Sequence, residues 1–305
     1  RDLHSFPTRR SSDLWSCNKK LALLFLLPAL LLLLLFVYYP IAESFVLSLY
    51  RWKAFSSERV YVGLEYYRKL FSDAVFYTAL KNNVLYSAIS IVFQVGLGLV
   101  FAAVLEEKLF RGMQPFFRTV YFLPSVISIS VVGLLFQLVY HPSIGLLNQG
   151  LRGIGLGGLC HAWLGEKNTA IFAIIATSQW QYMGYIMLLF LVAIQKIPQE
   201  LYEAAEIDGV NAFQKFRYVT LPQVKDTLVM CVIITLIGGF KVFDEVYVMT
   251  AGGPGRSTEV LASYLYRAGF RNDEMGLASA IATTIFAITF TMTLVQLLAS
   301  KRQES

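Results

Sequence analysis

The sequence is poor in charge, in histidine and in cysteine. Lys, Arg, Asp and Glu make up 15% of the 305 residues, whereas hydrophobic residues make up 56%. A soluble globular protein carries about a quarter of its residues as charges. The three cysteines and three histidines are too few and too scattered for a zinc cluster or a CxxC redox pair. The composition therefore predicts a membrane protein without a metal centre.

A nucleotide-binding loop is also missing. The pattern GxxxxGK[ST] does not occur, and the nearest glycine cluster, "GGPGRST" at residues 252–258, lacks both its lysine and its glycine spacing. We therefore expect a chain that does not hydrolyse ATP and binds no cofactor of its own. The glycine cluster predicts an external turn instead.

The first fourteen residues, "RDLHSFPTRRSSDL", differ from the rest of the chain. Back-translated, they resemble a common sequencing-library adapter read in frame, so we interpret residues 1–14 as an assembly artefact and leave them out of the fold. A short disordered basic tail is the alternative. The segment holds three Arg and two Asp, so the formal charge without it is +5 rather than +6.

Six runs are long and apolar enough to cross a bilayer, for which a helix needs about 20 mostly apolar residues. The first run follows two lysines, but it is too long for a cleavable signal peptide and no small-residue cleavage site follows it. The sequence therefore predicts an all-α integral membrane protein with six transmembrane helices and both ends on one side. The six runs cover approximately residues 21–40, 82–104, 120–140, 169–194, 228–250 and 276–299.

Charge in the loops does not set the orientation. Lys and Arg are normally in excess on the cytoplasmic side, but here the two alternate sets of loops carry eleven each. Within residues 62–80, Leu64, Tyr67, Leu70 and Phe71 share one face of a helical pattern. That pattern predicts either a helix in the membrane interface or the solvated start of the second span.

One connection between spans carries helix signals of its own. The stretch "EAAEIDGVNAFQKFRYVTLP" (residues 203–222) lies between the fourth and fifth runs. Pro198 suits the first turn of a helix, and Gly209 suits the left-handed residue that ends one. Asn211 suits the cap of a second helix, after which the chain starts afresh at Pro222. We expect two short helices joined by a sharp turn at the membrane surface, within residues 195–225.

The first of these helices suits a protein partner. Small side chains at Ala204 and Ala205 let another chain come close, and Glu203, Glu206 and Asp208 offer carboxylates to Arg or Lys across an interface. A DNA-binding helix-turn-helix is the weaker interpretation, because residues 196–217 hold three basic and four acidic residues and phosphate contacts need the opposite balance. We expect no nucleic-acid partner.

This loop resembles that of the permease subunits of binding-protein-dependent ABC importers. Their pattern is EAA, three residues, G, nine residues, Ile, one residue, then LP; Val219 stands here at the Ile position, and Asp208 completes the DG pair common in sugar importers. The resemblance extends over nearly all of the chain after residue 20, and residues 240–270 are similar to the carbohydrate-importing branch. The positions that match the pattern are Glu203, Ala204, Ala205, Gly209, Leu221 and Pro222.

The resemblance implies the type I ABC importer permease architecture, in the inner membrane of a bacterium or archaeon, with the loop and both termini in the cytoplasm. The implied partners are a second, related permease, a cytoplasmic ATPase dimer that holds ATP and Mg²⁺, and an extracytoplasmic solute-binding protein, which the 252–258 turn would contact. Closure of the ATPase dimer would pull on the loop and drive alternating access. The implied solute is a sugar or sugar derivative; importers of glycerol-phosphate belong to the same branch and are an alternative. The residues implied to contact the ATPase are Glu203, Ala204, Ala205, Asp208, Gly209, Leu221 and Pro222.

Later spans hold candidates for the solute pathway. At helical spacing, Lys241 predicts an ion pair with Asp244 or Glu245 at the mouth of the pathway. An ion-coupled secondary transporter, which would use such charges as a relay, is a remote alternative. Membrane aromatics more often pack or sit at the interface than bind solute. The candidates for the pathway are Trp180, Tyr185, Phe240, Lys241, Asp244 and Tyr247.

Overall fold

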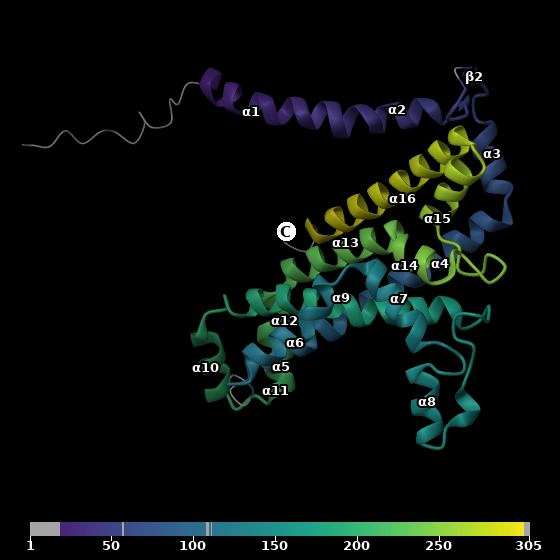
Figure 1. Ribbon diagram of the computed structural model, residues 1–305. Helices are drawn as coiled ribbons and strands as arrows, with labels where there is room; N and C mark the ends of the chain where they lie inside the picture. The colour runs from purple at the N-terminus through teal and green to yellow at the C-terminus, as the bar shows by residue number, and fades with distance from the viewer. Residues whose placement is uncertain (1–18, 57, 108–109, 111, 302–305) are drawn as a thin grey trace, which may run out of the picture.

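The computed structural model describes residues 19–301 apart from residues 57, 108–109 and 111 (Figure 1). The adapter interpretation of residues 1–14 lies outside the described residues. Almost all of the described chain is helical, and a two-stranded antiparallel ladder joins β1 (Tyr50–Arg51) to β2 (Val60–Tyr61).

The helical elements include several π-helical segments, labelled η, as well as one 3₁₀ turn, η4. In chain order they are α1 (Lys19–Leu33), η2 (Leu34–Tyr38), α2 (Tyr39–Leu47), α3 (Glu65–Ser72), α4 (Ala74–Ser90), η3 (Ile91–Leu97), α5 (Gly98–Glu106), α6 (Gln114–Val126), α7 (Ile129–Val139), α8 (Leu146–Gly153), η4 (Gly157–Leu159), α9 (Ala170–Ile194), α10 (Gln199–Ile207), α11 (Ala212–Lys215), η5 (Phe216–Thr220), α12 (Leu221–Gln223), α13 (Lys225–Lys241), α14 (Asp244–Thr250), α15 (Leu261–Tyr266), η6 (Arg267–Arg271) and α16 (Met275–Lys301).

Three uninterrupted helices are long and apolar enough to cross a membrane, namely Leu24–Leu47, Ala74–Glu106 and Met275–Leu298. Three further pairs of neighbouring helices reach this length and hydropathy when the two helices of a pair are taken together, but each pair is bent at a short break. The bends are 98° between α6 and α7, 80° between α9 and α10, and 75° between residues 212–223 and α13. The described chain thus has three spanning helices, or up to six if each bent pair is one span.

The prediction of a single helix over residues 120–140 is wrong, because α6 and α7 are separate helices. Helix α6 continues through Pro124 to Val126 and ends where Ile127 leaves the helical conformation with ψ 138°. The amide of Gln181 on α9 donates to the Ile127 carbonyl over 2.9 Å, which satisfies a backbone group at the break. Close packing holds α6 on α9, since a Cβ on Gly184 would overlap the Tyr121 carbonyl.

The helix expected over residues 228–250 is also broken, between α13 and α14. Val242 leaves the helical conformation with ψ 128°. Beside this break the Asn83 amide on α4 donates to the Gly239 carbonyl over 2.7 Å, and its oxygen accepts from the Leu261 N–H over 2.9 Å. Side-chain hydrogen bonds between helices of this kind satisfy backbone groups that apolar surroundings would otherwise leave unpaired.

The segment expected as one helix over residues 62–80 contains two. Asp73 ends α3 and caps α4, accepting a hydrogen bond from the Val75 N–H over 2.9 Å. The buried side of α3 is also different from the expected one, because Tyr66 and Leu70 are buried whereas Phe71 is 51% exposed. The apolar spacing was compatible with either face, and the contacts with α16 select the one used.

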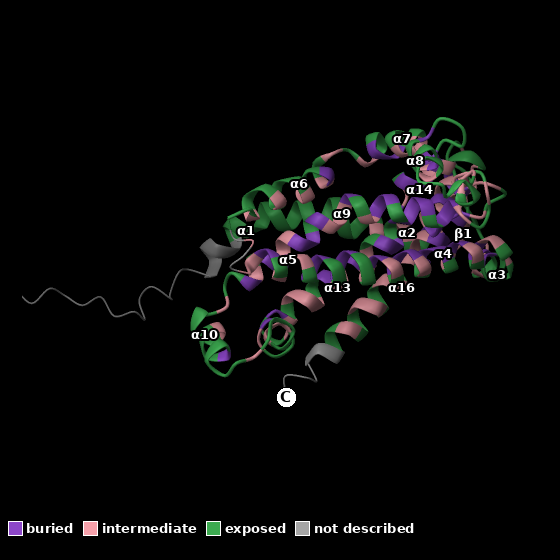
Figure 2. Cartoon of the chain, turned by 90° about the horizontal axis from the view of Figure 1, so that it is seen from below, coloured by how far each residue is buried: buried purple, intermediate pink, exposed green. Residues whose placement is uncertain are grey.

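The core is built around α9, which packs against α5, α6 and α13. Figure 2 shows the buried residues concentrated on α9, α4 and α13, whereas α10 and the loop around it are largely exposed. The helix formed by α1, η2 and α2 lies at the outside of the bundle, where α2 packs against α16 (Figure 1). This arrangement leaves the loop that contains α10 projecting from one end of the bundle.

Candidate functional site

Local sequence chemistry shapes the loop between α9 and α13. Helix α10 ends in a turn in which the Val210 N–H donates to the Ala205 carbonyl and the Gly209 N–H to the Glu206 carbonyl, both over 3.2 Å. This pair of bonds defines a Schellman motif, which needs a left-handed residue after the helix. Gly209 provides it with φ +72°, so the predicted glycine turn is confirmed.

The second helix of the loop begins as expected and continues further than expected. Asn211 and Gln214 form a capping box with two reciprocal 2.9 Å hydrogen bonds, which confirms the predicted cap. The chain does not restart at Pro222, because helical backbone runs from α11 through η5 into α12. The wider π-helical turn before Pro222 eases the clash of its ring with the preceding turn.

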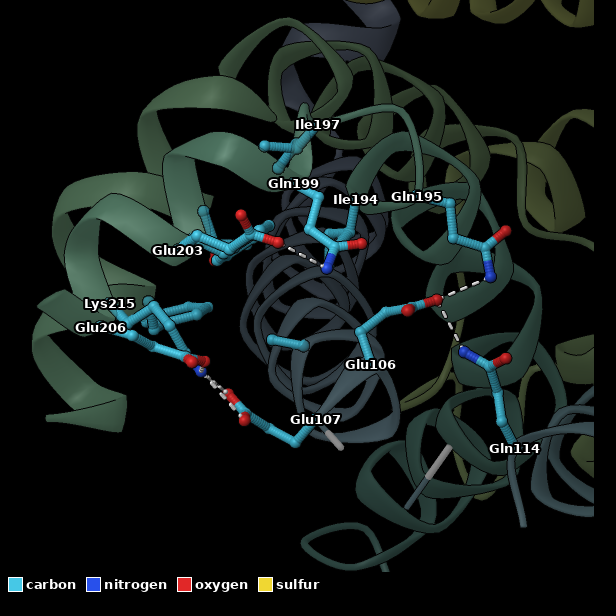
Figure 3. Close-up of a pocket in the computed structure, with 14 residues that line it drawn as sticks. Glu106, Glu107, Gln114, Ile194, Gln195, Ile197, Gln199, Glu203, Glu206 and Lys215 are labelled. Carbon is cyan, nitrogen blue, oxygen red and sulfur yellow. Dashed lines mark hydrogen bonds and ion pairs between the residues drawn. The ribbon is translucent and has the colours of Figure 1, made fainter. Parts of the chain in front are cut away.

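A cleft of about 520 Å³ lies between this loop and the cytoplasmic ends expected for α5 and α9 (Figure 3). Four carboxylates line it, and Lys215 is the basic residue among its lining side chains. The four acidic residues are Glu106, Glu107, Glu203 and Glu206. The cleft is therefore electronegative and suits a guanidinium or ammonium group from another chain.

Hydrogen bonds and ion pairs tie the loop to the helices behind it. Glu106 accepts from the amides of Gln114 and Gln195, both over 2.6 Å. The Lys215 ammonium lies 3.0 Å from the Glu107 carboxylate and 4.0 Å from that of Glu206. Lys215 thus bridges the end of α5 to the end of α10, as Figure 3 shows.

A further contact joins α10 to η5. The Tyr202 hydroxyl lies 3.1 Å from Thr220 Oγ1. Burial raises the pKa of the Tyr202 phenol above its ordinary value, and the hydrogen bond to Thr220 lowers it in part. The phenol therefore stays protonated at neutral pH and holds the two segments together as a neutral contact.

The predicted loop residues do not all face outward. Glu203 is exposed and accepts from the Gln199 amide over 2.9 Å, and Ala204 is exposed, but Ala205 is buried at 8%. Ala205 therefore packs inward instead of forming the expected outer surface. Asp208, Gly209 and Pro222 are exposed and Leu221 is half-buried.

Sequence reasoning missed the most exposed apolar side chains of the loop. Ile207 is 86% exposed and Phe213 is 73% exposed, on either side of the glycine turn. It also missed Glu106 and Glu107, which are about a hundred residues away in the chain. The one available signal was their position as a charged pair that closes the second apolar run.

A second candidate site is a cavity of about 590 Å³ among α4, η3, α9 and α13. Tyr185, Lys241 and Asp244 line it, so the structure brings three of the pathway candidates together. Glu245 also lines it and accepts from the Tyr86 hydroxyl over 3.3 Å. The cavity thus combines aromatic rings with hydroxyl and charged groups, as sites for polar organic molecules do.

The prediction that Lys241 forms an ion pair with Asp244 or Glu245 is wrong. Among the described residues no carboxylate lies within 4.0 Å of its ammonium. The reason is the break after Lys241, which removes the helical spacing that would have placed Asp244 one turn away. Lys241 and Asp244 are instead both exposed at the cavity.

The other pathway candidates lie away from this cavity. Phe240 is fully buried in the hydrophobic core, where it packs with α3 and α16 residues. Trp180 contacts Phe136 with ring centroids 5.3 Å apart, and Tyr247 stacks on Phe243 at 5.1 Å. Phe243, the stacking partner of Tyr247, does line the cavity.

Bent helical spans around a polar cavity, with an exposed loop set over an acidic cleft at one end, define an integral membrane protein with a candidate translocation site and a candidate docking surface. Comparison with known families makes this specific. The chain belongs to the family of binding-protein-dependent transport system inner membrane components, whose model matches residues 94–304.

Individual relatives agree over nearly the whole chain. The probable ABC transporter permease protein YurN of Bacillus subtilis is 54% identical over 280 residues, which cover 92% of this chain and 96% of YurN. The trehalose/maltose transport system permease protein MalF of Thermococcus litoralis is 35% identical over 282 residues, covering 91% and 92% of the two chains. A bacterial alginate ABC transporter, solved in complex with an alginate pentasaccharide-bound periplasmic protein, contains a chain with a TM-score of 0.82 and 26% identity, over 95% of this chain and 97% of that one. This chain is therefore a multi-pass ABC transporter permease of the inner membrane.

Proposed function

We propose that this chain is a permease subunit of an ATP-driven, binding-protein-dependent importer of a sugar or sugar derivative. The family supports the transport role, and the trehalose/maltose relative and the alginate transporter support the carbohydrate solute. The observation that carries the proposal is the exposed loop of two capped helices over an acidic cleft, which is a ready docking site for an energy-supplying partner.

The partners follow from this role. A cytoplasmic ATPase dimer binds ATP and Mg²⁺ and hydrolyses the nucleotide, a second permease completes the pathway, and an extracytoplasmic solute-binding protein delivers the sugar. The loop then lies on the cytoplasmic side together with both termini, and the segment 252–258 lies outside, where it is available to the binding protein.

Within the loop, each candidate has a separate task. Glu203 and Asp208 offer carboxylates to basic groups of the ATPase, and Ala204 leaves room for its backbone. Gly209 makes the turn, Ala205 and Leu221 pack toward the protein, and Pro222 lies in α12 at the end of the loop. The exposed side chains of Ile207 and Phe213 supply the apolar area of the contact, because large apolar groups at an interface contribute most of its stability.

The first experiment is co-purification of the chain with its ATPase, followed by sugar-stimulated ATP hydrolysis in lipid. Gly209→Asp places a charged side chain in a left-handed turn and should abolish both. Gly158→Asp is the matched control, since Gly158 is exposed on the opposite end of the molecule and a Cβ there meets no atom within 4 Å. Transport without any ATPase, unchanged by Gly209→Asp, would contradict the proposal.

One observation favours an acidic solute, such as a glycerol-phosphate, as the second candidate. Lys241 reaches the cavity with no carboxylate of the described residues within 4.0 Å of its ammonium, although Asp244 and Glu245 line the same cavity. A cation in a membrane-embedded cavity is costly unless a ligand or partner compensates it. Lys241→Met should then lower import of an acidic solute and spare neutral sugars, whereas equal import of both classes by the variant would remove this candidate.

A further inference from the structure

A buried ion pair lies beneath the turn that residues 251–259 form between α14 and α15. The Glu259 side chain is 0% exposed, and the Arg267 guanidinium at the start of η6 lies 3.0 Å from its carboxylate. Among the residues that the structure describes, no other Lys, Arg or His nitrogen comes within 4.0 Å of this carboxylate. A buried carboxylate without a charge partner is costly. Glu259 therefore depends on Arg267, and we call these two residues the latch.

The latch joins the two ends of the turn. The Arg267 guanidinium also donates to the Ala251 carbonyl over 3.1 Å, so one side chain reaches from the end of α14 to Glu259. The Glu259 carboxylate in turn accepts from the Ser263 hydroxyl of α15 over 2.8 Å. Gly252 passes close above the pair with φ +85°, and a Cβ there would lie 2.9 Å from Glu259 Oε2. The backbone of the turn is thus fitted closely around the latch.

Further hydrogen bonds give the turn a defined shape. The Asn82 amide on α4 donates to the carbonyls of Ser257 and Glu259, both over 2.8 Å. Within the turn the Thr258 hydroxyl donates to the Gly253 carbonyl over 2.7 Å. The backbone N–H groups of residues 253, 257, 258 and 259 donate to carbonyls of residues 250–256. The base of the turn is therefore held to the second span as well as to α15.

The tip of the turn is exposed and basic. Gly255 and Arg256 are exposed, whereas Thr258 and Glu259 at the base are buried. A Cβ on Gly255 would lie 3.3 Å from the side chain of Lys167, which is also exposed, so a second positive charge adjoins the tip. The turn lies at the end of the bundle opposite α10 (Figure 1). Two cations on a backbone of fixed shape suit an acidic surface of another folded protein, because a preorganised contact loses little freedom on binding.

We infer that the latch holds the 251–259 turn in the shape in which Arg256 and Lys167 dock on an acidic surface of the extracytoplasmic solute-binding protein. The inference rests on the proposed import function and specifies the residues and the charge by which this partner is recognised. Glu259 and Arg267 are positioning residues that act beneath the tip. Without the latch the turn opens, so only a fraction of the importer is ready to dock and its apparent affinity falls by that fraction.

Hydrogen–deuterium exchange of the importer in lipid nanodiscs measures the turn itself. Arg267→Met should speed the exchange of the backbone amides of residues 253–259 about ten-fold, because local opening no longer has to break the latch. Arg267→Lys keeps the charge and should change exchange less. The control is Lys69→Met, which breaks the exposed 2.8 Å pair of Lys69 with Glu274. Native exchange in Arg267→Met would overturn the latch.

Docking is measured as the concentration of sugar-loaded binding protein that gives half-maximal ATP hydrolysis by the importer. This concentration should rise about ten-fold for Arg267→Met and about three- to ten-fold for Arg256→Gln, with the maximal rate unchanged. Added salt should weaken docking less in Arg256→Gln than in the native importer, because one charge contact is gone. Arg68→Gln removes another exposed positive charge, from α3, and should change little.

The outcomes separate docking from folding. Arg256 is exposed, so Arg256→Gln should fold even if Arg267→Met does not. A lower melting temperature of Arg267→Met with an unchanged half-maximal concentration would overturn the inference, and so would equal effects of Arg256→Gln and Arg68→Gln. If the native importer holds its ATPase but no binding protein stimulates it, the proposed function fails. If the native importer is stimulated and Arg267→Met and Arg256→Gln match it, the latch and the basic tip fail alone.

Discussion

The ion pair between Lys215 and Glu107 should determine how well the loop docks onto the ATPase. This pair links the end of α5 to the second helix of the loop, and its ammonium–carboxylate distance is 3.0 Å. At an effective dielectric constant of about 20 the direct attraction is about 5 kcal/mol, but desolvation and side-chain ordering offset most of it. Fully exposed pairs contribute about 0–1 kcal/mol.

The exposure of the two side chains sets the expected magnitude. Lys215 is 16% exposed and Glu107 is 38% exposed, so the pair lies between a surface pair and a buried one. We expect it to contribute about 1–2 kcal/mol to the docking-competent arrangement of the loop, which corresponds to a five- to thirty-fold change in ATPase affinity. Lys215→Met should cost more than Glu107→Gln, because Lys215 also faces Glu206 at 4.0 Å.

The assay is titration of the purified ATPase onto the permease in nanodiscs, for the native chain, both single variants and the double variant. The double variant should bind no worse than Lys215→Met alone, since one interaction is removed by either change. Lys196→Met, which removes an exposed positive charge from the same loop, is the control and should change little. Strictly additive losses, or a Lys196 effect as large as that of Lys215, would refute the reasoning.

Three further substitutions test other parts of the structure. Gly209→Ala should weaken ATPase binding, because a left-handed alanine costs about 1–2 kcal/mol, while Gly209→Asn should lose less; identical affinities would contradict a need for the left-handed turn. Gly184→Ala should push α6 away from α9 at the Tyr121 carbonyl and lower the free energy of unfolding by about 1–3 kcal/mol. The measurement is the melting temperature in detergent, which should fall for Gly184→Ala and not for the control Gly150→Ala. Asn83→Leu should destabilise the chain by about 1–3 kcal/mol, since two backbone groups lose their partner; an unchanged melting temperature would show that these groups find other partners.

The loop was predictable because its signals are local. A glycine in the left-handed turn and an asparagine that caps the next helix act within a few residues, and both Gly209 and Asn211 are where the sequence places them. The breaks after Val126 and after Lys241 were not predictable from hydropathy, because an apolar run continues through both. They depend on contacts from other helices, such as those of Gln181 and Asn83.

The residues of the candidate sites likewise divide into those that the sequence predicts and those that only the fold brings together. Tyr185, Lys241 and Asp244 were found by their residue type in a membrane segment, and they do line one cavity. The burial of Phe240 could not be found that way, since an aromatic residue beside a lysine fits either a core or a pathway. The acidic cleft needs Glu106 and Glu203 together, and nothing short of the fold places them on its wall.

The outer position of the first helix has a consequence for how the protein is made. None of the most apolar window of Leu24–Leu47 is buried inside the bundle, and its mean hydropathy is 2.5. This helix can therefore enter the bilayer as soon as it leaves the ribosome, without waiting for any other segment. The next long helix carries Asn82, Asn83 and Gln94 at buried positions, and within the described chain the side-chain amides of the two asparagines donate to carbonyls more than 150 residues later. We therefore expect the helix Leu24–Leu47 to insert into the membrane before the next long helix completes its folding, because Asn82 and Asn83 find their partners in chain made later.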